Sequence, residues 1–88
     1  MNKIEIKSEA TDMVKSGIGY RLEVPDTIIG KGFYNSRIYA SIAEATIAKG
    51  ILMLLIERDG INKEFYSEFD FLLRATLRLN YSTKTWKE

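Results

Sequence analysis

Residues 41–60 read SIAEATIAKGILMLLIERDG, and no other stretch of the chain is so apolar or so clearly bounded. Ser41 and Glu44 have the capping-box spacing, in which a hydroxyl and a carboxylate each satisfy a free backbone N–H at a helix start. Gly60 suits the position just after a helix C-terminus. The spacing therefore predicts a central helix over residues 41–60.

This predicted helix is apolar around most of its circumference. At helical spacing its apolar residues fall on two sides, one with Ile47, Ile51, Leu54 and Leu55 and the other with Ala45, Ala48, Leu52 and Ile56. An apolar arc this wide needs two partners, such as a sheet and a second helix. Gly50 costs about 1 kcal/mol relative to alanine inside a helix, so we expect a neighbouring backbone to approach closely there.

The second helix is predicted over about Lys63–Leu79, with Asn62 as its cap. Its inward-facing residues recur at helical spacing and are Phe65, Phe69, Leu72, Leu73, Thr76 and Leu77. The loop after Gly60 is short, which makes the two helices an antiparallel hairpin. Residues 81–88 are expected to form either an edge strand or a loose tail.

The N-terminal part reads as short strands. Lys3–Lys7 and Gly19–Val24 alternate apolar and polar residues, as half-buried strands do. Between them, the spacing predicts a short helix over about Glu9–Ser16. Thr27–Ile29 offers a brief further strand, and Phe33–Tyr39 another that is interrupted in its middle. The expected fold class is α+β, with a small N-terminal antiparallel sheet of three or four strands and a short helix near the N-terminus, packed on a C-terminal antiparallel helical hairpin.

The length of 88 residues indicates one domain, just large enough to fold without disulfides or metals. We divide it into a sheet-forming part at about residues 1–40, a helical hairpin at about 41–80 and the tail or edge strand at 81–88. A 45% hydrophobic and 28% charged composition is ordinary for a globular protein and argues against disorder.

The chain contains neither cysteine nor histidine. Thiolate catalysis and Cys-ligated zinc are therefore excluded, and the commonest general base and metal ligand is missing. We expect no enzyme activity, no cofactor and no metal. The formal net charge is only +1, so no overall field draws the protein to nucleic acid or to a membrane. A start without a signal-peptide core and a longest apolar run of Ile51–Ile56 predict a cytoplasmic protein that does not enter a membrane.

Phe71 is the most informative position for function, because it points away from the inward stripe of the last helix. Its neighbours on that face include Ser67, Arg74 and Arg78. One interpretation is that Phe71 is covered, either by Trp86 and the tail or by the short first helix. The other is that Phe71 belongs to a contact surface. Phenylalanine beside arginine suits a protein–protein contact, so these four residues form the candidate protein-contact patch.

The same arginines also suit phosphates, and the candidate nucleic-acid contacts are Arg37, Arg74, Arg78 and Lys84. A strand near Arg37–Ala40 followed by two helices resembles the ribbon-helix-helix DNA-binding proteins over Tyr34–Leu79. The resemblance implies a dimer that inserts paired strands into the major groove, with Arg37 and Tyr39 at groove-facing positions.

We therefore expect a non-catalytic, protein-binding regulator or inhibitor. Small size without catalytic groups is typical of accessory proteins of phages and mobile elements, which act on a host protein. The alternative is a nucleic-acid-binding regulator, either a ribbon-helix-helix-like dimer or a protein with a basic patch on its last helix. A homodimer is also allowed, because Ile42 and Met53 lie with Lys49 in the uncovered arc of the central helix.

Overall fold

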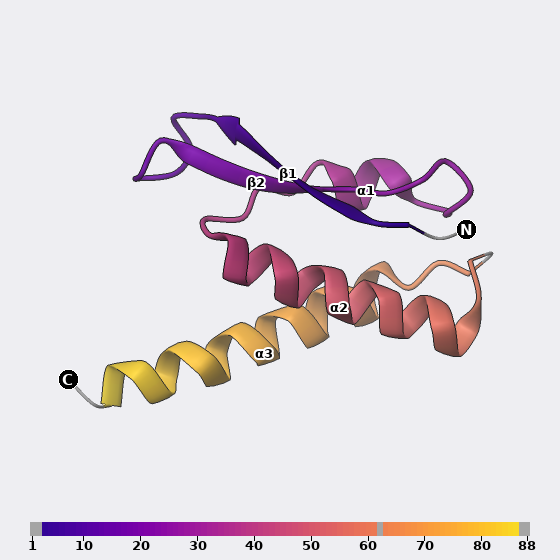
Figure 1. The fold of residues 1–88 in the computed structure, drawn as a ribbon. Helices are drawn as coiled ribbons and strands as arrows, with labels where there is room; N and C mark the ends of the chain where they lie inside the picture. Colours follow the sequence, from indigo (N-terminus) through magenta and orange to yellow (C-terminus); the bar gives the residue numbers. More distant parts are fainter. Residues whose placement is uncertain (1–2, 62, 87–88) are drawn as a thin grey trace.

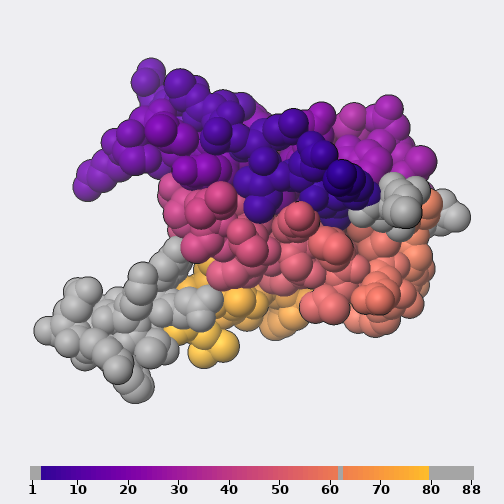
Figure 2. All heavy atoms as spheres, viewed as in Figure 1, coloured from indigo at the N-terminus to yellow at the C-terminus, as the bar shows by residue number. Residues whose placement is uncertain are grey.

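The protein has an α+β fold in which one helix lies between a small sheet and a second helix. A computed structural model describes residues 3–61 and 63–86, with side chains described as far as Leu79. The elements, in chain order, are β1 (Glu5–Ala10), β2 (Ile18–Glu23), α1 (Lys31–Asn35), α2 (Ile42–Asp59) and α3 (Tyr66–Trp86). Figure 1 shows α2 between the β1–β2 hairpin and α3, and Figure 2 shows the same order in space-filling form.

The predicted central helix is confirmed, together with both of its ends. The Oγ of Ser41 accepts a hydrogen bond from the backbone N–H of Glu44 at 3.2 Å, so Ser41 caps α2 as its spacing indicated. At the other end Gly60 has a positive φ of 89°, and its N–H donates to the carbonyl of Ile56 at 2.6 Å. Glycine tolerates that backbone conformation without a steric penalty, which is why the helix ends there.

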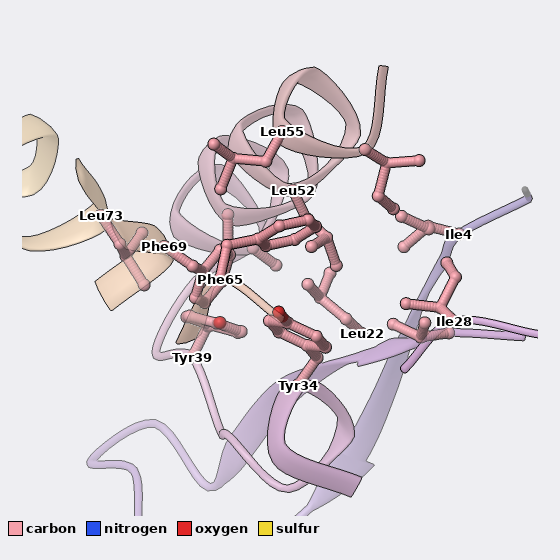
Figure 3. Close-up of a cluster of buried hydrophobic side chains, with 14 residues drawn as sticks. Ile4, Leu22, Ile28, Tyr34, Tyr39, Leu52, Leu55, Phe65, Phe69 and Leu73 are labelled. Carbon is pink, nitrogen blue, oxygen red and sulfur yellow. The ribbon is translucent and has the colours of Figure 1, made fainter. Parts of the chain in front are cut away.

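A single core holds the elements together, and α2 supplies its centre. Leu52, Ala45 and Ala48 are completely buried, and the two alanines let other elements pack close to the α2 backbone. Figure 3 shows Ile4, Leu22 and Ile28 from the N-terminal part gathered on one side, with Phe65, Phe69 and Leu73 on another. The full set of buried hydrophobic residues is Ile4, Leu22, Val24, Ile28, Tyr34, Tyr39, Ala45, Ala48, Leu52, Leu55, Ile56, Phe65, Phe69 and Leu73.

The predicted short helix at residues 9–16 is wrong. β1 instead continues to Ala10 and pairs with β2 in antiparallel register, with Glu9 opposite Gly19. A turn follows, closed by a 2.9 Å hydrogen bond from the N–H of Thr11 to the carbonyl of Gly17. Strand pairing satisfies the backbone hydrogen-bonding groups of residues 8–10. A helix at residues 9–16 would have little apolar surface to bury, since Met13 is 78% exposed.

The predicted strand over Phe33–Tyr39 is also wrong, and within the described residues the sheet has two strands rather than three or four. Residues 31–35 form α1, and the strand-like contact shrinks to one bridge between Tyr20 and Tyr39. A helical turn places Tyr34 fully inside the core. It also lets the side chain of Asn35 accept a hydrogen bond from the N–H of Val24 at 2.9 Å. The segment at residues 27–29 forms no strand, and Ile28 fills the core from a turn.

The second long helix begins at Tyr66 and not at Lys63, and its backbone continues to Trp86. The stretch expected to be an edge strand or a loose tail is therefore helical as far as Trp86, whereas the predicted cap Asn62 lies outside the described residues. α2 and α3 pack on each other and run in roughly opposite directions, crossing at an angle (Figure 1). Arg58 joins them at their connected ends, because its guanidinium donates to both carboxylate oxygens of Glu68 at 2.8 and 2.9 Å.

An aromatic cluster fastens α1 to the beginning of α3. The ring of Tyr34 lies 5.1 Å from that of Phe69, edge to face, and the rings of Phe33 and Tyr66 are 4.8 Å apart. Gly30 makes the approach feasible, because it has a φ of 86° and a Cβ placed on it would lie 2.2 Å from the Tyr66 ring.

Gly30→Ala should destabilise the protein by about 1–3 kcal/mol, since it adds both left-handed backbone strain and a clash with Tyr66. Gly32→Ala is the matched control, because a Cβ there meets nothing within 4 Å. It should leave stability unchanged or raise it by up to about 1 kcal/mol. Urea unfolding of both variants measures the difference, and equal stabilities would contradict the described packing.

Burial also makes stability depend on alkaline pH. It raises the pKa of Tyr34 and of Tyr39 to about 12. The tyrosines of the unfolded chain lose their protons near pH 10, whereas those of the folded chain keep them to about pH 12. The stabilisation of the folded state by the two protonated tyrosines is therefore complete below about pH 10 and is lost as the pH rises to about 12. The loss is up to about 2–3 kcal/mol for each tyrosine. Urea midpoints measured across this range should fall less steeply in the double variant Tyr34→Phe, Tyr39→Phe. An identical fall in wild type and variant would show that the two hydroxyls do not titrate as described.

Candidate functional site

The residues predicted to form a protein-contact patch lie together on the outer face of α3. Ser67, Phe71, Arg74 and Arg78 follow one another at steps of four, three and four residues, which keeps them on one side of a helix. At 1.5 Å of rise per residue the row is about 16 Å long. All four are exposed, and we call them the α3 outer stripe.

Phe71 is the centre of this stripe and is 69% exposed. Its neighbours Phe69 and Leu73 are buried, because they lie on the opposite face of the helix against the core. The backbone of α3 continues as a helix to Trp86, so as far as that residue the backbone does not turn back over Phe71. The short first helix that was the other candidate cover does not form, and the side chain of Trp86 lies outside the described residues. A large aromatic side chain is thus presented to solvent between Ser67 and Arg74.

A shared carboxylate orients the cations near the stripe. Asp70 forms ion pairs with the Nη2 of Arg37 at 2.6 Å and with the Nε of Arg74 at 3.1 Å. The side-chain contact with Arg37 is the main reason why the pKa of Asp70 lies below its usual range, and the charges of both arginines lower it further. Asp70 therefore stays ionised at neutral pH and holds Arg74 beside Phe71, whereas Arg78 forms no ion pair with another described residue.

An open cleft of about 510 Å³ adjoins the stripe where α1 meets the start of α3. It is lined by Phe33, Ser36, Arg37, Tyr66, Ser67 and Asp70. Phe33 and Tyr66 were not among the predicted site residues, and Phe33 was expected in a strand. No local pattern pairs two residues so far apart in the chain, and only the packing of α1 on α3 brings their rings together.

The four residues predicted as nucleic-acid contacts do not all belong to the α3 outer stripe. Arg74 and Arg78 lie on the stripe, but Arg37 is half-buried in its ion pair with Asp70. The side chain of Lys84 lies outside the described residues. Residues 36–41 form no strand, and Tyr39 is buried in the core, so the groove-facing strand of a ribbon-helix-helix protein is not found there.

The groups on this face are suited to binding. An aromatic ring, two guanidinium groups and a hydroxyl provide apolar contact, charge and hydrogen-bond donors. Among the described residues, no three acidic side chains gather closely enough to hold a metal ion. No helix in the described part of the chain has the length and apolar content needed to cross a membrane.

Comparison with protein-family models, curated proteins and solved structures gives no match.

Phe71→Ala should change the free energy of unfolding by no more than about 0.5 kcal/mol, because the side chain buries little surface. Phe69→Ala, two residues away on the buried face, should cost about 3–5 kcal/mol. Chemical denaturation of both variants measures the contrast. A comparably large loss at Phe71 would mean that this residue is covered in solution and is not available for binding.

Proposed function

We propose that the protein is a non-catalytic regulator or inhibitor that binds another protein through the α3 outer stripe. The supporting observation is the exposure of Phe71 at the centre of a row that also carries Arg74 and Arg78. Aromatic and arginine side chains are enriched among the residues that dominate protein–protein binding energy, because they combine large contact area with directed hydrogen bonds. The fixed position of α3 on the core presents this row without a large ordering cost on binding.

The chemistry of the stripe describes the partner. A complementary surface has an apolar depression that receives the Phe71 ring, flanked by carboxylates that meet Arg74 and Arg78. The adjoining cleft, which contains Ser67 and Phe33, extends the contact toward α1. The partner is thus an acidic protein surface with an apolar centre. We propose that this interaction takes place in the cytoplasm. A small chain without catalytic groups is typical of phage and mobile-element proteins that act on a host protein, and we propose that this protein is one of them.

The nucleic-acid alternative rests on the same residues, since Phe71 can stack on a base while Arg74 and Arg78 meet phosphates. Two observations favour the protein partner. Asp70 compensates part of the charge of Arg37 and Arg74, and the net charge of the chain is only +1. A nucleic-acid surface generally concentrates uncompensated positive charge.

The test compares wild type, Phe71→Ala and Met13→Ala as bait in extract of the organism that encodes the protein. Met13 is the control, because it is an exposed apolar residue in the β1–β2 turn, outside the stripe. A specific protein partner should bind wild type and Met13→Ala and lose about tenfold or more in affinity for Phe71→Ala. Nuclease treatment should leave that binding intact.

Direct titration with mixed-sequence single-stranded and duplex DNA separates the alternative, because only unstacked bases can receive the Phe71 ring. A nucleic-acid surface made by two arginines should lose about tenfold in affinity between roughly 50 and 200 mM salt, and should weaken again with Arg74→Ala or Arg78→Ala. That result, together with a protein interaction that survives Phe71→Ala, would replace the protein-binding proposal with the nucleic-acid one.

A further inference from the structure

A second surface, on α2, has no use in the proposed function. Three of the large apolar side chains of α2 are exposed, namely Ile42 at 59%, Met53 at 45% and Leu54 at 67%. Gly50 lies among them, and the hollow beside it is lined by Gly50, Met53, Leu54, Ile56 and Glu57. In Figure 2 part of α2 reaches the surface between the N-terminal part and α3.

Gly50 does not have the neighbour that the sequence predicts for it. A Cβ at this position would meet no described atom within 4 Å, so the expected close approach of a neighbouring backbone is not found within the described residues. The loss of about 1 kcal/mol in helix stability relative to alanine is thus not compensated by close packing in the described structure. A second helix seated against α2 from outside would be able to approach closely at this position.

The charges on this face identify the occupant. Lys49 precedes Met53 by four residues and Glu57 follows it by four, so the three side chains lie along one ridge of the helix. Neither Lys49 nor Glu57 forms an ion pair with another described residue. In an antiparallel pair of α2 helices with a two-fold axis at Met53, Lys49 of each copy is level with Glu57 of the other. The face is therefore complementary in charge to itself.

We propose that the protein forms a two-fold symmetric homodimer in which the exposed faces of two α2 helices pack antiparallel, centred on Met53. An isologous interface of this kind uses the same patch on both copies and closes without further growth. Met53 packs against its own copy at the axis, Leu54 of one chain covers the hollow at Gly50 of the other, and two Lys49–Glu57 pairs flank the axis. The α3 outer stripe lies on a different helix and takes no part in this interface.

Charge reversal tests the proposal without altering the core. Lys49→Glu and Glu57→Lys should each weaken dimerisation by about tenfold or more, because each places two like-charged pairs across the two-fold axis. The double variant should restore dimerisation to within about threefold of wild type, since it exchanges the charges and keeps the pairing. Sedimentation equilibrium over a range of concentrations measures association, and circular dichroism confirms that each variant is folded.

Disulfide cross-linking tests directly whether Met53 lies at the two-fold axis. The natural chain contains no cysteine, so a single introduced cysteine can form a disulfide only with its copy. Met53→Cys should form a disulfide-linked dimer rapidly under mild oxidation, because residues on a two-fold axis between closely packed helices bring their Cβ atoms within disulfide range. Met13→Cys is the control, because Met13 is 78% exposed and lies in the β1–β2 turn and not on α2; it should cross-link at the slower rate of random encounters. A wild-type protein that remains monomeric, or a dimer that is insensitive to both charge reversals and does not cross-link at residue 53, would overturn the proposal.

Discussion

The packing of α2 on two sides is the constraint on which the rest of the structure depends. The helix has too few polar residues to stand at a surface on its own, so its apolar arc must be covered by other elements. The β1–β2 hairpin covers one side through Leu22, and α3 covers another through Phe69, with Leu52 of α2 completely buried between them. Removing either of these elements would expose a large apolar area of α2. The dependence is mutual, because a two-stranded hairpin or a single helix has no independent core.

The smaller features of the fold follow from keeping those two covers in place. Tyr34 fills the space between α1 and the start of α3, where its ring lies 5.1 Å from that of Phe69, and the backbone bends into α1 to place it there. Arg58 fastens the connected ends of α2 and α3 through the carboxylate of Glu68, and Arg21 links β2 to α1 by donating to the carbonyl of Asn35 at 3.1 Å. Each of these contacts connects two elements of the fold in addition to the packing of the core.

Two surfaces remain after the core is assembled, and they differ in chemistry. The α3 outer stripe combines an exposed phenylalanine with arginines, which suits an acidic and partly apolar partner of different composition. The exposed face of α2 is apolar, and its two charges are opposite and evenly placed about Met53, which suits a second copy of the same face. They lie on different helices, the first on α3 and the second on α2.

The sequence by itself determined the α+β class, the position and both ends of α2, and the outward direction of Phe71. Each of these depends on contacts within a few residues: a capping hydroxyl at Ser41, a glycine at the helix end, and helical periodicity. Only the tertiary structure decided that residues 9–16 continue a strand and turn, that Tyr34 lies in a helix, and that Phe33 meets Tyr66. Those outcomes depend on partners distant in the chain, because short apolar segments fit a strand or a helix equally well until packing selects one.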